Sequence, residues 1–249
     1  MAGSTHPVTS LAAALDLGDR ELVSIVGGGG KSTLMFGLGN ELAHAGRRVV
    51  MTTTTKMGRD QALVVPTVCW SADTVSTEEA LDGPGPVMLV TGGDHHKVTG
   101  PPPDLVDHLY ADSTADYIVV EADGSHGRPL KAPAAHEPVI PSASTTVIIL
   151  MGIDAVGSPL GEVTHRVAQA MSFTGLKEDH ILTPCNCAEI LVHPDGALRV
   201  CPPQSRVLVG LTNTRTPSDK AAAEIERALS GHPQIESCLQ IDLDPLSGG

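Results

Sequence analysis

Four consecutive glycines followed by lysine, serine and threonine constrain the fold of this chain more than any other segment. The segment Gly27-Gly-Gly-Gly-Lys-Ser-Thr33 follows the apolar run Leu22–Val26 and leads into Ser32–Ala45, where apolar residues recur at helical spacing. The expected order is therefore strand, loop and helix. Glycines allow successive backbone N–H groups to point at phosphate oxygens, and the start of a helix adds its positive end. The segment predicts a phosphate-binding loop.

The residues after the glycines give this loop its chemistry. Lys31 is predicted to reach the β and γ phosphates of a nucleoside triphosphate, and the Ser32 hydroxyl to coordinate Mg²⁺. Further nucleotide contacts are expected from the backbone of Gly27, Gly28, Gly29, Gly30 and Thr33. The usual loop spacing has one more glycine where this chain has Ile25. The alternative is a merely flexible glycine-rich turn, which the Lys-Ser-Thr sequence and the flanking elements disfavour.

A later strand ends in two carboxylates. The apolar run Tyr117–Val120 leads into Glu121-Ala-Asp-Gly124, and in nucleotide hydrolases such a strand lies beside the strand of the phosphate loop. We predict that Asp123 joins Ser32 in the magnesium shell and that Glu121 orients an attacking water or an acceptor. The alternative is an ordinary turn with a solvated Asp-Gly, which would be preferred if the lysine loop were absent.

Two cations follow these acids. Arg128 and Lys131 are candidate clamps for a transferred phosphoryl group or for an anionic second substrate, since the chain around them is acidic. The alternative, which is almost as well supported, is that Arg128 and Lys131 form salt bridges with acidic side chains at the surface. The run Thr52–Thr55 with Lys56 has the same ambiguity, because threonine is also a good strand residue.

The net charge narrows the range of partners. The formal charge of -13 disfavours nucleic acids and anionic membranes, which would require a basic face that displaces counterions. We expect neither as a partner. No stretch approaches the roughly 20 apolar residues of a membrane span, and the N-terminal sequence lacks the features of a signal peptide. The five cysteines do not have the spacing of a disulfide framework, so a reducing cytoplasm is the expected location.

Strands alternate with helices along the chain. We expect strands at Leu22–Val26, Val49–Met51, Ala62–Cys69, Val87–Val90, Tyr117–Glu121, Thr146–Leu150 and Val207–Leu211, and helices after the loop and at Thr77–Leu81, Asp104–Tyr110, Thr164–Met171, Cys187–Leu191 and Asp219–Leu229. This alternation predicts an α/β fold with a mostly parallel central sheet, whose ligands bind at the carboxyl ends of its strands. Residues 1–249 are expected to form one domain, with a less regular lobe at about 152–203.

Several segments, in the same order over most of the chain, resemble the YqeC family. They are VGGGGKST at the loop, TTTTK at Thr52–Lys56, KVTG at Lys97–Gly100, VVEADGSHGRPLKAPAAHEPVIP at Val119–Pro141 and VTHR at Val163–Arg166. The resemblance implies a P-loop NTPase fold, a three-layer sandwich with a small inserted lobe. It also implies an accessory role in the maturation of a selenium-dependent molybdenum hydroxylase or its cofactor. The implied partners are that hydroxylase or its cofactor-maturation proteins.

The element that would read the nucleotide base departs from the family pattern. Members commonly carry Asn-x-x-Asp after a late strand, similar to the guanine-reading motif of GTPases, and the stretch here is Asn213-Thr-Arg-Thr216. Asn213 is a candidate nucleotide contact, whereas Thr216 replaces the aspartate that would accept hydrogen bonds from guanine. The cofactors predicted are therefore Mg²⁺ and ATP or GTP, with ATP preferred.

Three functions are compatible with these residues. The first is a magnesium-dependent NTPase that supports maturation of the hydroxylase. The second is a nucleotide-gated protein that carries the cofactor and docks on its client, with slow hydrolysis. The third is a small-molecule kinase or ligase, in which Arg128 and Lys131 bind the acceptor.

Overall fold

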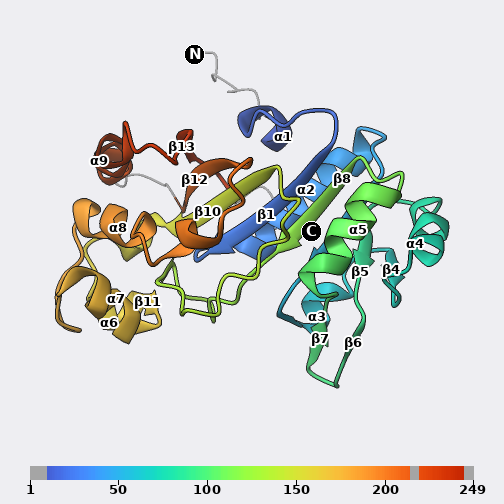
Figure 1. The fold of residues 1–249 in the computed structure, drawn as a ribbon. Helices are drawn as coiled ribbons and strands as arrows, with labels where there is room; N and C mark the ends of the chain where they lie inside the picture. Colours follow the sequence, from blue (N-terminus) through green and yellow to red (C-terminus); the bar gives the residue numbers. More distant parts are fainter. Residues whose placement is uncertain (1–9, 214–218, 244–249) are drawn as a thin grey trace, which may run out of the picture.

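A large parallel sheet crosses the molecule in the computed structural model, which describes residues 10–213 and 219–243 (Figure 1). Its eight strands follow the order β13-β12-β10-β1-β8-β2-β5-β4, and each neighbouring pair is parallel. They are β1 (Glu21–Gly27), β2 (Val49–Thr53), β4 (Thr67–Cys69), β5 (Val87–Leu89), β8 (Tyr117–Glu121), β10 (Thr146–Gly152), β12 (Arg206–Thr212) and β13 (Ser237–Gln240). The predicted α/β class and parallel sheet are confirmed.

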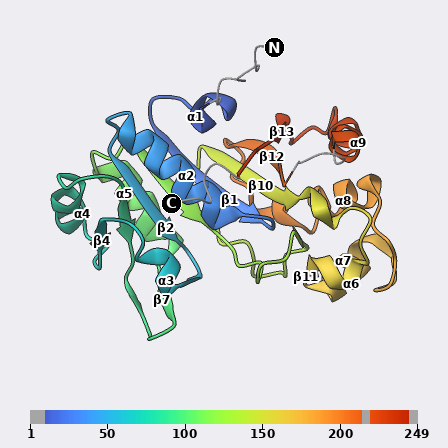
Figure 2. The ribbon, with the colours of Figure 1, turned by 180° about the vertical axis from the view of Figure 1, so that it is seen from behind.

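Helices cover both faces of this sheet, with α5 in front in Figure 1 and α2 in front in the reverse view of Figure 2. The helices are α1 (Leu11–Ala14), α2 (Lys31–His44), α3 (Arg59–Ala62), α4 (Thr74–Leu81), α5 (Pro103–Asp112), α6 (Leu160–Val163), α7 (Val167–Thr174), α8 (Pro184–Leu191) and α9 (Asp219–Leu229). Side chains of β1 alternate between two cores: Val23 and Ile25 pack with α1 and α2, and Leu22 and Val26 with α5, α8 and α9. The fold is a three-layer sandwich of the P-loop NTPase type.

The position of β1 explains where ligands can bind. All seven of its residues are buried, since it has strands on both sides and helices on both faces. Ile25 aligns with Glu121 of β8, and Gly27 aligns with Leu150 of β10. The carboxyl ends of β1, β8 and β10 therefore meet at one edge of the sheet.

Two smaller sheets lie near that edge. An antiparallel sheet of β3 (Lys56–Gly58), β7 (Lys97–Thr99) and β6 (Gly92–Gly93) follows the carboxyl end of β2 and projects at the lower right of Figure 1. The other is a parallel pair of β9 (Leu130–Lys131) and β11 (Thr164–His165). This pair joins the segment after β8 to the region after β10.

The region between β10 and β12 contains only short elements. Besides α6, β11, α7 and α8, it holds the 3₁₀ helices η1 (Ile153–Ala155) and η2 (Ala197–Val200). Buried side chains such as Leu160, Ile190 and Leu198 belong to the same hydrophobic cluster as Val209 of β12. The region therefore packs onto one face of the central sheet.

Two expected elements differ from the structure. The strand predicted over Ala62–Cys69 was wrong in its first half, because Ala62 ends α3 and only Thr67–Cys69, after Pro66, forms the edge strand β4. The helix predicted over Thr164–Met171 was also misplaced. Arg166 has the left-handed φ of 66°, which separates strand β11 from helix α7. The spacing of apolar residues indicates neither the left-handed conformation of Arg166 nor the pairing of β11 with β9.

None of the helices within the described residues combines the length and the apolar composition that crossing a membrane requires.

Candidate functional site

The phosphate loop connects β1 to α2, as predicted. Gly30 is the N-cap of α2 with a φ of 107°, and no side chain caps this end of the helix. The first N–H groups of a helix have no partner within the helix. The start of α2 therefore offers donors and a positive dipole end to an anion.

The loop lies against neighbouring backbone so closely that Gly27, Gly28 and Gly29 leave no room for a Cβ. A Cβ on Gly28 would lie 2.5 Å from the carbonyl oxygen of Arg128. Gly29 has a φ of 75°, and a Cβ there would lie 2.2 Å from the backbone nitrogen of Gly152. Glycine is therefore required by packing as well as by the conformation of the loop.

Three of the four glycine N–H groups donate to protein acceptors in this structure. Gly28 donates to the Leu150 carbonyl at 2.9 Å, and Gly29 to the Arg128 carbonyl at 3.2 Å. The Gly27 N–H points at both carboxylate oxygens of Asp123, at 3.2 and 3.1 Å. If Gly28 and Gly29 bind phosphate as predicted, they must exchange these protein acceptors for it.

Lys31 is almost fully buried and is held by the loop itself. Its Nζ donates to the Gly27 carbonyl at 2.7 Å and lies 3.3 Å from Oδ1 of Asp123. Only 4% of the residue is exposed. A buried ammonium needs such partners, and a phosphate arriving at the loop would provide a stronger one.

The two acids at the carboxyl end of β8, Glu121 and Asp123, have different partners. The Ser32 hydroxyl donates to Oε2 of Glu121 at 2.6 Å. Asp123 is 1% exposed and lies between Lys31 and Lys131, whose Nζ is 3.1 Å from its Oδ2. Burial raises the pKa of the Glu121 carboxyl above its usual value, against the opposing effects of Lys31 and the Ser32 hydrogen bond.

Asp123 is part of a longer series of charged contacts, which we name the ion-pair chain: Lys31, Asp123, Lys131, Glu137 and Arg166. Lys131 also lies 3.1 Å from Glu137, and the guanidinium of Arg166 binds Glu137 through two hydrogen bonds of 2.9 and 3.0 Å. Burial acts to raise the pKa of Glu137, but Arg166 and Lys131 outweigh it and lower that pKa to about 2. The chain connects the phosphate loop to the β11–α7 junction.

A chamber of about 780 Å³ opens beside the loop. One wall is Gly30–Thr33 with Glu121, and the other walls come from residues 55–58, 61, 97, 124–127, 137 and 165–166. The sequence motifs assign no site role to Gln61, Lys97, His126, Glu137, His165 or Arg166. Most of them lie in segments that carry the family resemblance, which was the available signal.

The predicted residues Gly27–Gly29, Asp123 and Lys131 do not line this chamber, and neither do Arg128 and Asn213. The Arg128 side chain is exposed, and its residue reaches the loop through the backbone carbonyl. Asn213 follows β12 and donates through Nδ2 to Asp154 at 3.3 Å. Thr216 lies outside the described residues. The roles predicted for Arg128 and Asn213 stay predictions.

The oxygen donors beside the loop fit a magnesium ion. Ser32 and Glu121 already share a hydrogen bond, and Mg²⁺ prefers a few protein oxygens completed by water and phosphate. Within the part of the chain that the structure describes, no three histidine, cysteine or acidic side chains gather as a metal-binding group.

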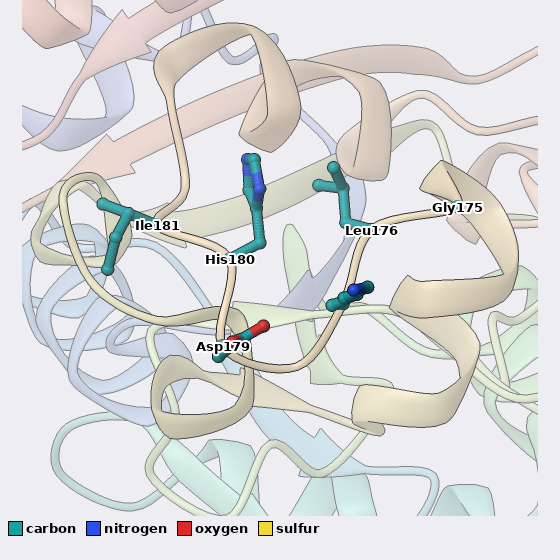
Figure 3. A pocket seen from close by; sticks show the side chains of 6 residues that line it. Gly175, Leu176, Asp179, His180 and Ile181 are labelled. Atoms are coloured by element: carbon teal, nitrogen blue, oxygen red, sulfur yellow. The ribbon is translucent and has the colours of Figure 1, made fainter.

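A separate hollow lies in the loop between α7 and α8 (Figure 3). It is lined by Gly175, Leu176, Lys177, Asp179, His180 and Ile181. These residues come from one short loop and are distinct from the residues that line the chamber beside the phosphate loop.

The sheet, the glycine loop between β1 and α2, and the lysine and serine at the start of α2 are the features of the P-loop class of proteins. Known proteins narrow this class further. The family model described as "YqeC protein" matches residues 23–168. The chain belongs to the YqeC family.

One relative and one solved structure illustrate these similarities. The chain is 35% identical over 225 residues to "Uncharacterized protein YqeC" from Escherichia coli (strain K12), an alignment that covers 86% of this chain and 85% of the relative. A crystal structure of the hydrogenase maturation factor HypB from Archaeoglobus fulgidus has a TM-score of 0.45 and 13% identity, with 94% of this chain and 87% of that chain covered.

Proposed function

We propose that this protein is a magnesium-dependent NTPase that acts as an accessory factor in the maturation of a selenium-dependent molybdenum hydroxylase or of its cofactor. The contact that carries the NTPase assignment is the 2.6 Å hydrogen bond between Ser32 and Glu121, beside the Lys31 ammonium. A hydroxyl, a carboxylate and a cation therefore lie close together at the start of α2. The accessory role rests on membership of the YqeC family.

Each residue has a defined task in this proposal. Lys31 leaves the Gly27 carbonyl and Asp123 and neutralises the β and γ phosphates, while Asp123 keeps its contact with Lys131. Ser32 and Glu121 would hold Mg²⁺, which when bound offsets charge on the phosphates. The geometry favours Glu121 over Asp123 as the carboxylate nearest the metal, because Asp123 is already surrounded by cations and the Gly27 N–H.

Substitution of Lys31 tests the nucleotide site. Lys31→Ala is expected to weaken ATP and GTP binding at least about tenfold, since the ammonium that faces the phosphates is lost. The measurement is calorimetric titration of both nucleotides with Mg²⁺. Lys177→Ala, at an exposed lysine outside the site, is the matched control and should bind like the wild type.

A thermal melt must accompany that titration, because Lys31 is buried. After this substitution Asp123 still has Lys131 as a partner. We therefore expect the free energy of unfolding to fall by less than the about 3 to 5 kcal/mol that is lost when a buried charge keeps no partner. A folded Lys31→Ala protein with undiminished affinity for both nucleotides would contradict the assignment of this loop.

We expect ATP to bind at least as well as GTP. In this chain Thr216 replaces the aspartate that accepts paired hydrogen bonds from guanine, so the means of preferring guanine is lost. Competition between the two nucleotides for the wild-type protein measures the preference. A strong preference for GTP would instead require another guanine-binding carboxylate, for which Asp219 is the candidate.

A nucleotide-gated carrier is the second candidate, and the loop geometry supports it. Gly28 and Gly29 donate to protein carbonyls, so phosphate binding would displace the Arg128 and Leu150 contacts and shift the segments around them. Single-turnover hydrolysis with and without a hydroxylase client separates the two functions. Turnover without a client supports an NTPase, and hydrolysis that stays slow until the client is added supports a gated carrier. Co-purification would identify the client and the bound nucleotide.

A further inference from the structure

We propose that the chamber beside the phosphate loop is the binding site for a second, small anionic ligand that carries a phosphate group. The chamber has a volume of about 780 Å³, within the range of small-molecule pockets. It is lined by Lys56, Lys97 and Arg166 as well as by the stacked imidazoles of His126 and His165. We keep one assumption from the proposed function, namely that the loop itself holds the nucleotide.

The position of the chamber in the sheet separates it from the predicted base site. Most of its walls lie on one side of β1, since Thr55 and Lys56 follow β2 and residues 124–127 follow β8. His165 and Arg166 come from the region after β10 and reach this side through the pairing of β11 with β9. Asn213 follows β12, which lies on the other side of β1 beyond β10. A nucleotide whose phosphates sit on the loop and whose base lies toward Asn213 leaves the chamber for a different molecule.

Two lysines in the chamber come from neighbouring strands of the small antiparallel sheet. Lys56 of β3 is opposite Thr99 of β7, and Lys97 is opposite Gly58, so the two lysines share one face of this ribbon. The alternating residues Met57 and Val98 point to the other face and are buried. The pleat therefore directs both ammonium groups to the same side.

These lysines are not held by ion pairs within the described residues. The salt bridges around the chamber use Lys31, Lys131 and Arg166, and within the described residues none uses Lys56 or Lys97. Asp94 senses the charge of Lys56, but its carboxylate accepts the backbone N–H groups of His96 and Lys97. Like charges on one face of a sheet repel each other, and a shared anion would remove that repulsion.

The opposite wall is also arranged in an unusual way. His126 and His165 stack with ring centroids 4.7 Å apart, and Nδ1 of His165 is buried without a hydrogen-bond partner among the described residues. His126 and Arg166 have positive φ values of 52° and 66°. Such strained conformations in non-glycine residues cluster at ligand sites.

The charge state of this wall is consistent with binding a polar ligand. Burial, with the positive charge of Lys131, lowers the pKa of His165, so its imidazole is neutral at pH 7. A neutral imidazole has one donor and one acceptor nitrogen. A ligand that orders or moves the ring would give Nδ1 the partner it lacks.

The test is a calorimetric titration of inorganic phosphate onto protein saturated with a non-hydrolysable ATP analogue and Mg²⁺. Lys56→Ala combined with Lys97→Ala is expected to weaken phosphate binding at least about tenfold while ATP affinity stays within about twofold. The matched control is Lys177→Ala combined with Lys220→Ala, which removes two exposed lysines elsewhere and should leave both affinities unchanged.

Three results would overturn the proposal: no phosphate binding to the loaded wild type, no effect of the two lysine substitutions, or an equal loss of ATP affinity. The last result would show that Lys56 and Lys97 serve the nucleotide itself. If the analogue does not bind to the wild type, the proposed function fails on its own. The chamber is then tested by titrating inorganic phosphate onto Lys31→Ala and onto the triple variant that also carries Lys56→Ala and Lys97→Ala. Only weaker phosphate binding by the triple variant than by Lys31→Ala supports the chamber.

Discussion

At the scale of single residues, Glu121 and Asp123 show how two nearby acids acquire different roles. Glu121 ends β8 and accepts the Ser32 hydroxyl, so it faces the start of α2. Asp123 lies past the end of the strand and accepts the Gly27 N–H while contacting Lys31 and Lys131. The first is placed to act on a ligand, and the second holds the loop against the segment after β8.

Separate substitutions distinguish these roles. Glu121→Gln is expected to abolish most of the magnesium dependence of nucleotide binding and to lower turnover by about 100-fold, since the carboxylate beside Ser32 is lost. Asp123→Asn should mainly lower the melting temperature, because Lys31 loses its counter-charge and Lys131 is left with Glu137 alone. Titrations with and without Mg²⁺, paired with melts, measure both effects.

The opposite pattern would restore the sequence-based assignment of Asp123 to the metal. In that case Asp123→Asn would lose magnesium dependence while Glu121→Gln kept it. Glu79→Gln, on the exposed side of α4, provides a control for removal of a carboxylate.

At the scale of elements, the ion-pair chain links parts that are distant in sequence. Lys131 lies on β9, Arg166 lies between β11 and α7, and Glu137 joins them. The β9–β11 pairing brings these residues together, because Leu130 aligns with Thr164 and Lys131 with His165. The phosphate loop and the region between β10 and β12 are thus mechanically connected.

The acid sensitivity of this connection follows from Glu137. Its pKa of about 2 in the fold is below the usual 4.5, so ionised Glu137 stabilises the fold above pH 4.5 and this contribution is lost as pH falls toward 2. Glu137→Gln should cost about 3 kcal/mol near neutral pH, because Lys131 is left with less compensation. The stability gap between wild type and variant should shrink below about pH 4.5.

Urea unfolding of the wild type, Glu137→Gln and the exposed control Glu79→Gln between pH 7 and pH 3 measures that gap. A gap that stays constant over this range would mean that the Glu137 contacts do not depend on its charge. The control should show no comparable gap at any pH.

At the scale of the whole molecule, the strand order places the loop between two different environments. β1 has β10 and β12 on one side and β8 and β2 on the other. The side with β12 carries Asn213, and the side with β2 carries the small sheet that holds Lys56 and Lys97. Although the net charge of the protein is -13, the cationic side chains of Lys31, Lys56, Lys97 and Arg166 all line the chamber beside the phosphate loop.

The sequence alone was sufficient for the α/β class, the strand–loop–helix around Gly27–Ser32 and the strand that ends at Glu121. These features depend on local spacing, since a glycine run and an apolar period act within a few residues. The bounds of the edge strand β4 were wrong because its pairing with β5 determines them. The break at Arg166 was missed because it depends on the left-handed conformation of that residue.

The contacts within the site were decided only by the tertiary structure. Whether Ser32 meets Glu121 or Asp123 depends on where β8 ends relative to β1, and the pairing of Lys131 with Glu137 depends on the path of the chain after β9. Lys97 and His165 reach the chamber through pairings with β3 and β9. Sequence spacing determines what a segment can form, whereas burial and strand register determine which charges meet, because those energies exist only between segments that folding has brought together.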